Sequence, residues 1–402
     1  MGFFSKIFGK NDSNGISTDD HQSDDFTAAL SMHLRGEIEP ALTSYLKIAE
    51  NDPEDFLAPF FSSAIKAGAG NVDEAAENLR SLSQRISLTG DGITKVISVN
   101  LASLVSNDSF ISVPAVAEIV VTFGDVLKKS GFVQESAVCF EIAAGLVPSN
   151  AHVLHKLGDT LHDLRHYDYA ESVLLEALKL APNHWGSLYT YAVLLQDVGR
   201  FADAIAYYEQ AVRLDPNHVR CQNNYGVSLL QVNRLEEALE HCTLAAGLAP
   251  DFPLAKINLG NINLMMQQYE AARTWYEEAI ALDKNLAPAY FGLASAEQRL
   301  GGDTGRIRDL YLKTIELNPS LPDAHHALGN LLAGEGDQEA LAHYLAAAHL
   351  NNSLMNLHTD FGRACLQMGR REEGLEQRRT ALQQNRDDST AKRFLSEYAA
   401  KA

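Results

Sequence analysis

The sequence predicts an all-α protein, built as a solenoid of stacked helical hairpins. One observation is a fixed period, because the segments LAPN, LDPN and LAPD place Pro182, Pro216 and Pro250 34 residues apart, and Pro148 begins the series. A period of this length is typical of stacked helical arrays. Two further observations are columns of small residues that recur with the same period.

The small residues fall in one column in the first half of each unit and in two columns in the second half. Their members are Gly158, Ala192, Gly226 and Gly260; Ala170, Ala204, Ala238 and Ala272; and Ala177, Ala211, Ala245 and Ala279. Two helices whose backbones approach closely need small side chains at the contact, because larger ones would separate them and leave voids. Each unit is therefore expected to be a tight helical hairpin.

The segment LGDTLHDLRHYDYAESVLLEALKLAP, which begins at Leu157, resembles the tetratricopeptide repeat (TPR). It has the small residue in the first helix, two alanines in the second and a closing proline. A register kept over many units makes this resemblance specific. The resemblance implies a TPR superhelical solenoid of antiparallel helix pairs over about residues 22–388, in ten units.

Composition limits the classes of function. The 402 residues are 46% hydrophobic and 21% charged, as in ordinary soluble or repeat proteins. A net charge of −19 argues against nucleic acid as a partner, because phosphate binding needs a concentrated basic surface. The cysteines form no CxxC pair, so we interpret them as small buried residues in a reducing compartment, with metal or redox use as the weaker alternative: Cys139, Cys221, Cys242 and Cys365.

Residues 1–21 are expected to hold an amphipathic head peptide and an acidic tether. In the head peptide, residues 1–10, an apolar side and a basic side would form on a helix: Phe3, Phe4, Ile7 and Phe8 opposite Lys6 and Lys10. This pattern could rest on an anionic membrane surface, and the alternative is a terminus that packs on the first repeat or on nothing. The following stretch, from Asn11 to Asp25, has the composition of a flexible tether.

Residues 22–116 are expected to form an N-terminal lobe. Repeats 22–55 and 56–89 keep the small columns, and Gly36 and Gly70 mark their inner turns. The register then breaks, and the stretch from Gly90 to Val116 predicts one unpaired helix followed by a connector.

The main array is expected over residues 117–388, with eight repeats. GGDTG at 301–305 adds one residue and Ile307 replaces the alanine, so we expect a local kink or loosened packing there. Residues 389–402 predict a capping helix with the apolar residues Phe394, Leu395 and Tyr398 on one side.

The sequence contains no recognisable catalytic machinery. It has no Gly-rich phosphate loop, HExxH, nucleophile elbow or kinase-type set, so we expect no catalytic residues, no cofactor and no enzyme. The question becomes what the array binds.

The TPR resemblance implies that the first helix of each unit lines a groove for a partner. The positions that it assigns to this groove are Tyr189, Val193, Gln196 and Asp197; Arg220, Asn223, Val227, Leu230 and Gln231; Leu254, Ile257, Asn261, Leu264 and Met265; and Phe291, Ser295, Gln298 and Arg299. Apolar members could seat partner side chains, and the amides could bind its backbone. The alternatives are that some of these residues pack between repeats, or that a tail of the protein fills the groove.

Two TPR specialisations can be compared with these positions. The carboxylate clamp of chaperone-binding TPR domains is not reproduced, because the corresponding places hold His155, Asp159, Thr190, Arg220 and Asn224. Asn224 and Asn258 are similar to the asparagine ladder of O-linked N-acetylglucosamine transferases, although neighbouring units break the ladder. The similarity supports binding of a peptide backbone.

The spacing of the histidines argues against a metal site. His152, His155, Asp159 and His162 share one helical face, but they span about 15 Å at the helical rise per residue, so they cannot all bind one ion. We interpret them as a hydrated or pH-sensitive lining of the groove, and His184 as a turn residue that follows PN. No metal site is therefore predicted.

These observations predict a non-catalytic scaffold or adaptor that binds a protein or peptide. General resemblance places it in a bacterial cytoplasm, and the head peptide could bring it to the inner face of a membrane. The alternatives are a subunit that presents substrates to a separate transferase or envelope-assembly enzyme, and a homo-oligomer in which the N-terminal lobe enters a neighbour's groove.

Overall fold

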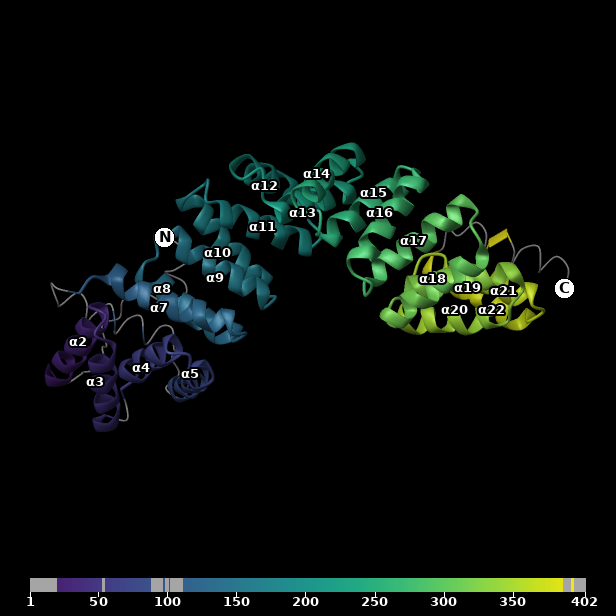
Figure 1. Cartoon of the computed structure of the whole chain (residues 1–402). Coiled ribbons are helices and arrows are strands. Elements are labelled where there is room, and N and C mark those ends of the chain that lie inside the picture. Colours follow the sequence, from purple (N-terminus) through teal and green to yellow (C-terminus); the bar gives the residue numbers. More distant parts are fainter. Residues whose placement is uncertain are drawn as a thin grey trace. The chain divides into compact units, whose positions relative to one another are not determined.

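The structure is a computed structural model that describes residues 20–52, 55–87, 111–385 and 392–393, together with Ile97 and Leu101. All regular elements in these ranges are α-helices (Figure 1). The chain divides into an N-terminal unit, Met1–Pro216, and a C-terminal unit, Asn217–Ala402. The predicted all-α fold is confirmed within the described ranges.

In the N-terminal unit, consecutive helices pair as hairpins. The helices are α2 (Asp20–Leu34), α3 (Ile38–Asn51), α4 (Leu57–Gly68), α5 (Val72–Ser87), α7 (Val113–Lys129), α8 (Val133–Leu146), α9 (Ala151–Asp163), α10 (Tyr167–Leu180), α11 (Trp185–Asp197) and α12 (Phe201–Leu214). The second helix of a hairpin also packs on the first helix of the next, as α8 does on α9.

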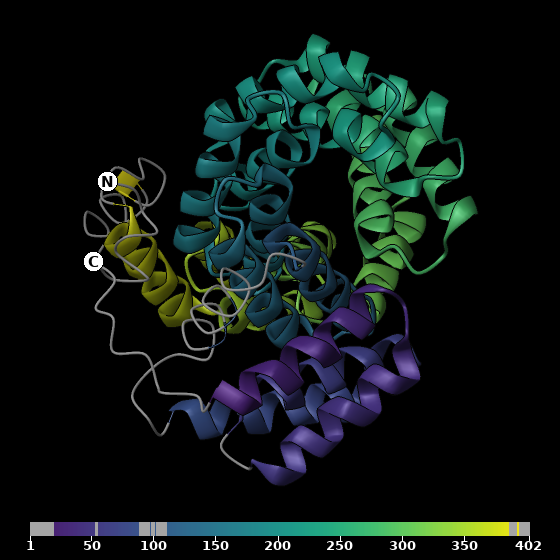
Figure 2. The same ribbon diagram turned by 90° about the vertical axis from the view of Figure 1, so that its left-hand side faces the viewer.

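The C-terminal unit repeats this arrangement (Figures 1 and 2). Its helices are α13 (Val219–Gln231), α14 (Leu235–Leu248), α15 (Pro253–Met265), α16 (Tyr269–Leu282), α17 (Ala287–Leu300), α18 (Thr304–Leu317), α19 (Pro322–Glu335), α20 (Glu339–Leu350), α21 (Leu357–Gln367) and α22 (Arg371–Gln384). The first helices of neighbouring hairpins contact one another, as α13 does α15, α15 does α17 and α19 does α21. These first helices therefore lie side by side in two groups within this unit, α13 to α17 and α19 to α21.

The small column explains why the two helices of a hairpin lie so close together. A Cβ atom on Gly158 would lie 2.6 Å from Cγ of Leu174, and one on Gly260 would lie 2.6 Å from Cε1 of Tyr276. Real Cβ atoms keep a greater distance, so only a small residue leaves room for the side chain that faces it from the second helix. The predicted close approach is confirmed in these hairpins.

The inner turns rely on left-handed backbone. Gly36 and Gly70 have φ of 79° and 96°, as their predicted place in the turns of the N-terminal lobe requires. Three non-glycine residues, Arg165, Asn233 and Gln267, adopt φ of 59–61° at equivalent turns. The turn geometry is therefore kept even where the sequence offers no glycine.

Two boundaries differ from those expected. Helix α2 begins at Asp20, inside the stretch up to Asp25 that was assigned to the tether. Acidic residues in a first turn interact favourably with the helix dipole, so this acidic segment can continue the helix. Helix α7 begins at Val113, before the expected start at 117.

The packing around Ile307 corrects one of the two alternatives expected there, loosened packing. Ile307 is only 2% exposed and lies in a core cluster with Ala294, Tyr311 and Leu328, so the packing is not loosened there. The added residue lies in the turn after α17, where Gly301 takes a left-handed φ of 72°.

Other expectations fall largely outside the described residues. These are the head peptide, with Phe3, Phe4, Lys6, Ile7, Phe8 and Lys10, most of the tether, most of the unpaired helix and most of the capping helix. Of the unpaired helix, Ile97 and Leu101 are described, and both are helical and fully buried.

Candidate peptide-binding surface on the first helices

The predicted groove residues fall into three classes of exposure. In the C-terminal unit, Asn223, Leu230 and Ile257 are buried, at 4%, 8% and 5% exposed. Val227, Asn261, Leu264 and Phe291 are partly buried there, as are Tyr189 and Val193 in the N-terminal unit; Arg220, Met265 and Arg299 are exposed.

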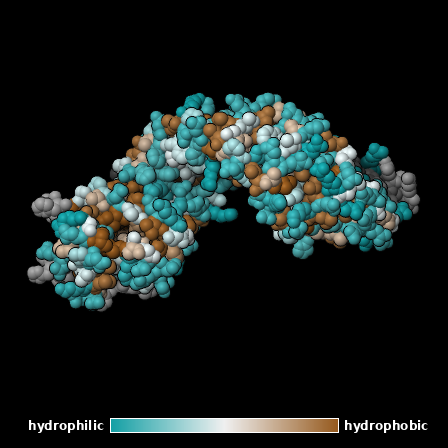
Figure 3. All heavy atoms as spheres, in the orientation of Figure 1, coloured by the Kyte–Doolittle hydropathy of each residue, from teal (hydrophilic) through white to brown (hydrophobic). Residues whose placement is uncertain are grey.

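Several of the apolar members belong to the core. Ile257 and Leu264 pack in a cluster around Tyr276. The Phe291 ring lies 5.8 Å from the Tyr311 ring, between centroids. These side chains therefore contribute to the core as well as to the surface of the first helices. Met265 is 50% exposed, and Figure 3 shows apolar residues interspersed with hydrophilic ones on the visible face.

Asn223 holds two first helices together. Its Oδ1 accepts a hydrogen bond of 2.9 Å from Nδ2 of Asn258, which joins α13 to α15. Its Nδ2 donates to Oδ1 of Asn224 at 3.2 Å. Because the amide of Asn223 is buried and used on both sides, its role here is to tie neighbouring repeats together.

In the C-terminal unit, three other amides are held in a different way, by tyrosines from the second helix of their own hairpin; in the N-terminal unit the Tyr208 hydroxyl donates to Oε1 of Gln196 in the same manner, at 2.9 Å. The Tyr276 hydroxyl donates to Oδ1 of Asn261 at 2.7 Å, and the Tyr311 hydroxyl to Oε1 of Gln298 at 3.0 Å. The Tyr344 hydroxyl donates to Oδ1 of Asn330 at 2.7 Å. We call Asn261, Gln298 and Asn330 the amide row. They lie on α15, α17 and α19.

The tyrosines that hold the amide row are buried and neutral. Tyr276, Tyr311 and Tyr344 are at most 1% exposed, and burial is the main cause that raises the pKa of each phenol. A neutral phenol can donate its proton, so each hydroxyl fixes the carbonyl side of its amide.

The other side of each amide is left for a ligand. An amide offers two N–H donors besides its carbonyl oxygen. The NH2 groups of Asn261, Gln298 and Asn330 have no hydrogen-bond partner among the described residues, and these side chains are partly or fully exposed. The row therefore presents N–H donors of fixed orientation.

A hollow of about 240 Å³ lies at the Asn330 end of the row. It is lined by Asn330, Ala333, Gly334, Tyr344, Asp360, Arg363, Ala364 and Gln367. Within it, Asp360 is bonded by Arg363 and by Nε2 of His326, the latter at 3.0 Å. The hollow thus combines an amide donor with a neutralised ion pair.

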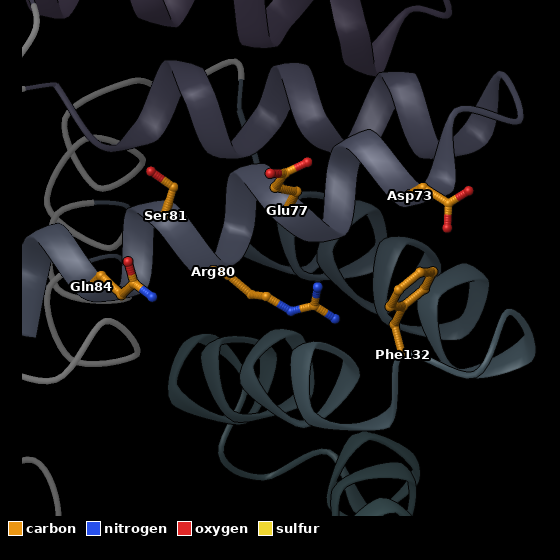
Figure 4. Close-up of a pocket in the computed structure, with 6 residues that line it drawn as sticks. All are labelled: Asp73, Glu77, Arg80, Ser81, Gln84 and Phe132. Carbon is orange, nitrogen blue, oxygen red and sulfur yellow. The ribbon is translucent and has the colours of Figure 1, made fainter.

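A larger cavity of about 540 Å³ lies in the N-terminal unit (Figure 4). It is lined by Asp73, Glu77, Arg80, Ser81, Gln84 and Phe132. The guanidinium of Arg80 lies 5.5 Å from the centroid of the Phe132 ring and bonds the carboxylate of Glu135. None of the predicted site residues lines this cavity.

The residues of α9 that were expected to share one face each contact a residue outside α9. Asp159 accepts from Nζ of Lys128 at 2.5 Å, and His162 pairs with Asp197 at 2.8 Å. His155 lies instead beside His184, with ring centroids 5.1 Å apart. The interpretation of His184 as a turn residue alone missed this contact. Its spacing of 29 residues from His155 gives no signal without the stacking of the repeats.

The hairpins, their small columns and their stacked first helices define a helical-repeat protein. Family models described as tetratricopeptide repeat match residues 151–184 and 189–251, and one described as TPR repeat matches 260–301. The region within residues 151–301 that these models match therefore consists of tetratricopeptide repeats, as the sequence resemblance predicts.

Several solved structures are similar to this chain, and the first of them supports the assignment of fold. A tetratricopeptide repeat protein from Parabacteroides merdae matches with a TM-score of 0.50 and 16% identity, over 61% of this chain and 97% of that one. PilF of Pseudomonas aeruginosa matches with a TM-score of 0.46 and 20% identity, over 53% and 95%. YrrB, described as a TPR protein with an unusual peptide-binding site, matches with 0.38 and 22%, over 48% and 98%. A search of curated proteins finds no significant match.

TPR proteins generally bind protein or peptide partners, and the repeats support a role as a protein-interaction scaffold in general terms. TPR folds are typically non-catalytic. Among the described residues, no helix has the length and apolar character that crossing a membrane would need.

Proposed function

We propose that the C-terminal unit binds an extended segment of a partner protein across α15, α17 and α19. In this proposal the NH2 groups of Asn261, Gln298 and Asn330 donate hydrogen bonds to backbone carbonyls of the segment. The observation that carries it is the set of three tyrosine hydroxyls that fix the amide oxygens and leave the N–H donors outward.

Orientation of the donors is what makes the row effective. A free amide must lose rotational freedom when it binds, and this cost is about 0.5–1.5 kcal/mol for a flexible side chain. The hydrogen bonds from the tyrosines already restrict the rotation of the amides, so less entropy is lost when the partner binds. Because backbone carbonyls occur in every peptide, the row supplies affinity that depends little on the partner's sequence.

Selectivity would come from the surroundings of the row. The chain carries a net charge of −19, so long-range attraction favours a neutral or basic segment. The half-exposed Met265 near the row can adapt to apolar side chains of different shape.

The test uses peptides selected on the intact protein from a random display library, with dissociation constants measured by fluorescence anisotropy. The double variant Asn261→Asp with Gln298→Glu keeps an oxygen for each tyrosine but removes the N–H donors. At about 0.5–1.5 kcal/mol for each lost hydrogen bond, affinity should fall by roughly 5- to 150-fold.

Asn285→Asp is the control for charge, because Asn285 is an exposed turn residue and the substitution adds, away from the row, one of the two negative charges that the double variant adds. It should change affinity less than about twofold, as expected for a screened surface charge. Equal affinity of the double variant and the wild-type chain would show that the amide row is not the binding site.

The finer predictions on location are part of this proposal. A cytoplasmic adaptor, brought to the inner face of a membrane by the head peptide, fits the basic and apolar pattern of residues 1–10. Vesicle sedimentation of the intact chain and of a chain without residues 1–10 tests this, and equal sedimentation of the two would contradict it.

A further inference from the structure

Three histidines of the N-terminal unit come together at the start of two neighbouring first helices. His152 and His155 lie near the start of α9, and His184 is the N-cap residue of α11. One ring nitrogen from each lies within 4.8 Å of the others. Within the described ranges, no other group of three or more such side chains has this geometry.

His155 is held with one nitrogen unused. Its Nδ1 is buried with no hydrogen-bond partner in the part of the chain that the structure describes, whereas Nε2 lies 3.2 Å from Oγ1 of Thr190. The Thr190 hydroxyl in turn lies 3.4 Å from Oδ1 of Asp159. Metal-binding histidines commonly donate their second nitrogen to such a partner, which fixes the ring and its tautomer.

The backbone of α11 makes room for this ring. A Cβ atom on Gly186 would lie 2.7 Å from Cε1 and 2.8 Å from Nε2 of His155. Only glycine therefore allows the imidazole to lie against the helix. In the next unit the places equivalent to His152 and His155 are Gly186 and Tyr189, so the cluster is not a general feature of the repeat.

His184 can change between two uses of its imidazole. Its Nδ1 accepts a hydrogen bond from the backbone nitrogen of Ser187 at 3.1 Å and lies 2.9 Å from the Ser187 hydroxyl. If Nε2 binds a metal, Nδ1 carries the proton and can donate to that hydroxyl instead. The Ser187 hydroxyl then accepts a hydrogen bond from the second nitrogen of His184, as the Thr190 hydroxyl would from that of His155.

We propose that His152, His155 and His184 bind one divalent transition-metal ion of the zinc class, with the remaining position open to water or to a ligand from a partner. Imidazole nitrogens suit this class of ion, and three histidines with one open position is a known coordination for zinc. Zn–N distances of about 2.0–2.1 Å place the nitrogens about 3.3 Å apart in a tetrahedral site. The nitrogens lie within 4.8 Å of one another, so the rings must move closer together on binding. The exposed His152 is free to rotate towards the other two, and His155 and His184 must also approach each other.

The nearby charges do not oppose the ion strongly. Lys156 is held by Asp125, with Nζ 2.7 Å from Oδ1, and Lys128 is held by Asp159 and Asp163 at 2.5 and 2.8 Å. Both cations are thus neutralised by carboxylates, and Asp159 also adds negative charge behind His155.

The site is tested by isothermal titration of the intact, metal-free chain with zinc chloride at neutral pH. We expect one zinc ion per chain, and cobalt should give the intense visible absorption of a tetrahedral site. His155→Ala should abolish saturable binding. His184→Asn should also abolish it, although asparagine keeps the helix cap.

The matched control is His218→Asn. His218 caps α13 as His184 caps α11, with its Nδ1 accepting from the backbone nitrogen of Cys221 at 3.1 Å. This variant should bind zinc as the wild-type chain does. Thr190→Val should weaken binding by about 10- to 100-fold, the usual effect of losing a partner of a ligating histidine.

A tautomer measurement separates this site from adventitious binding. In long-range ¹H–¹⁵N spectra, Nδ1 of His184 should change from acceptor to protonated nitrogen on addition of zinc. The proposal is overturned if the wild-type chain shows no saturable binding, if the histidine variants bind as tightly as the wild-type chain, or if zinc binds without this change at His184.

Discussion

The packing of the small column can be tested at Gly260, whose substitution by alanine adds one methyl group. A Cβ atom there would lie 2.6 Å from Cε1 and Cζ of Tyr276, and non-bonded carbons prefer about 3.5–4.0 Å. The ring has little freedom to move, because it contacts Gly292 on its other side and its hydroxyl is bonded to Asn261 at 2.7 Å.

The size of the effect follows from two terms. Inserting a methyl group into a packed core costs about 1–3 kcal/mol. Replacing glycine by alanine inside a helix otherwise gains about 0.5–1 kcal/mol. Gly247→Ala isolates the second term, since Gly247 is an exposed residue of α14 and a Cβ there would meet nothing within 4 Å. Gly260→Ala should therefore be less stable than Gly247→Ala by about 1–3 kcal/mol.

The assay is urea unfolding followed by the fluorescence of Trp275, which neighbours Tyr276 in α16. The chain has two tryptophans, so a Trp185→Phe background leaves Trp275 as the sole reporter. A local reporter is needed because repeat arrays need not unfold in one step. Equal midpoints for Gly260→Ala and Gly247→Ala would refute the close-packing explanation of the small column.

Three further predictions concern buried polar groups. Burial lowers the pKa of His155 to about 4, so between about pH 6.5 and 4 the unfolded chain binds a proton that the folded chain does not. The free energy of unfolding should therefore fall by about 1–3 kcal/mol as the pH drops through this range. Urea midpoints measured in the presence of a chelator should fall less in His155→Gln than in the wild-type chain. The Tyr45 hydroxyl is buried and has no hydrogen-bond partner among the described residues, so Tyr45→Phe should be neutral or stabilising. Tyr276→Phe should instead cost about 0.5–1.5 kcal/mol, and equal effects in urea unfolding would contradict this contrast. Arg80→Met leaves the buried carboxylate of Glu135 without its cation and should cost about 1–3 kcal/mol in thermal unfolding, while no loss would show that water replaces the arginine.

Much of the fold was predictable because small residues recur with the period of the repeat. Gly158 and Gly260 stand where a second-helix side chain presses on the first helix, and such a contact leaves a periodic trace in the sequence. The turn after α17 shows the limit of that inference. An added residue breaks the period, yet Gly301 absorbs it in the turn and Ile307 stays buried.

The candidate site was less predictable, because hydrogen-bond partners do not follow the period. Asn223 and Asn261 look alike in sequence, but the first ties α13 to α15 and the second is held by Tyr276. A signal was present in the tyrosines, since Tyr208 and Tyr276 stand two periods apart on second helices, and the hydroxyl of each donates to a first-helix amide, Gln196 and Asn261. The cluster around His184 was hidden, because it depends on how neighbouring hairpins stack.

The central claim is that N–H donors of the amide row contact the bound segment. It is tested most directly by the side-chain amide resonances of Asn261, Gln298 and Asn330 in ¹H–¹⁵N spectra during titration with a selected peptide. These NH2 signals should shift and saturate with the binding curve, while that of the exposed turn residue Asn285 stays in place. Saturable binding that leaves the three signals unmoved would contradict the claim.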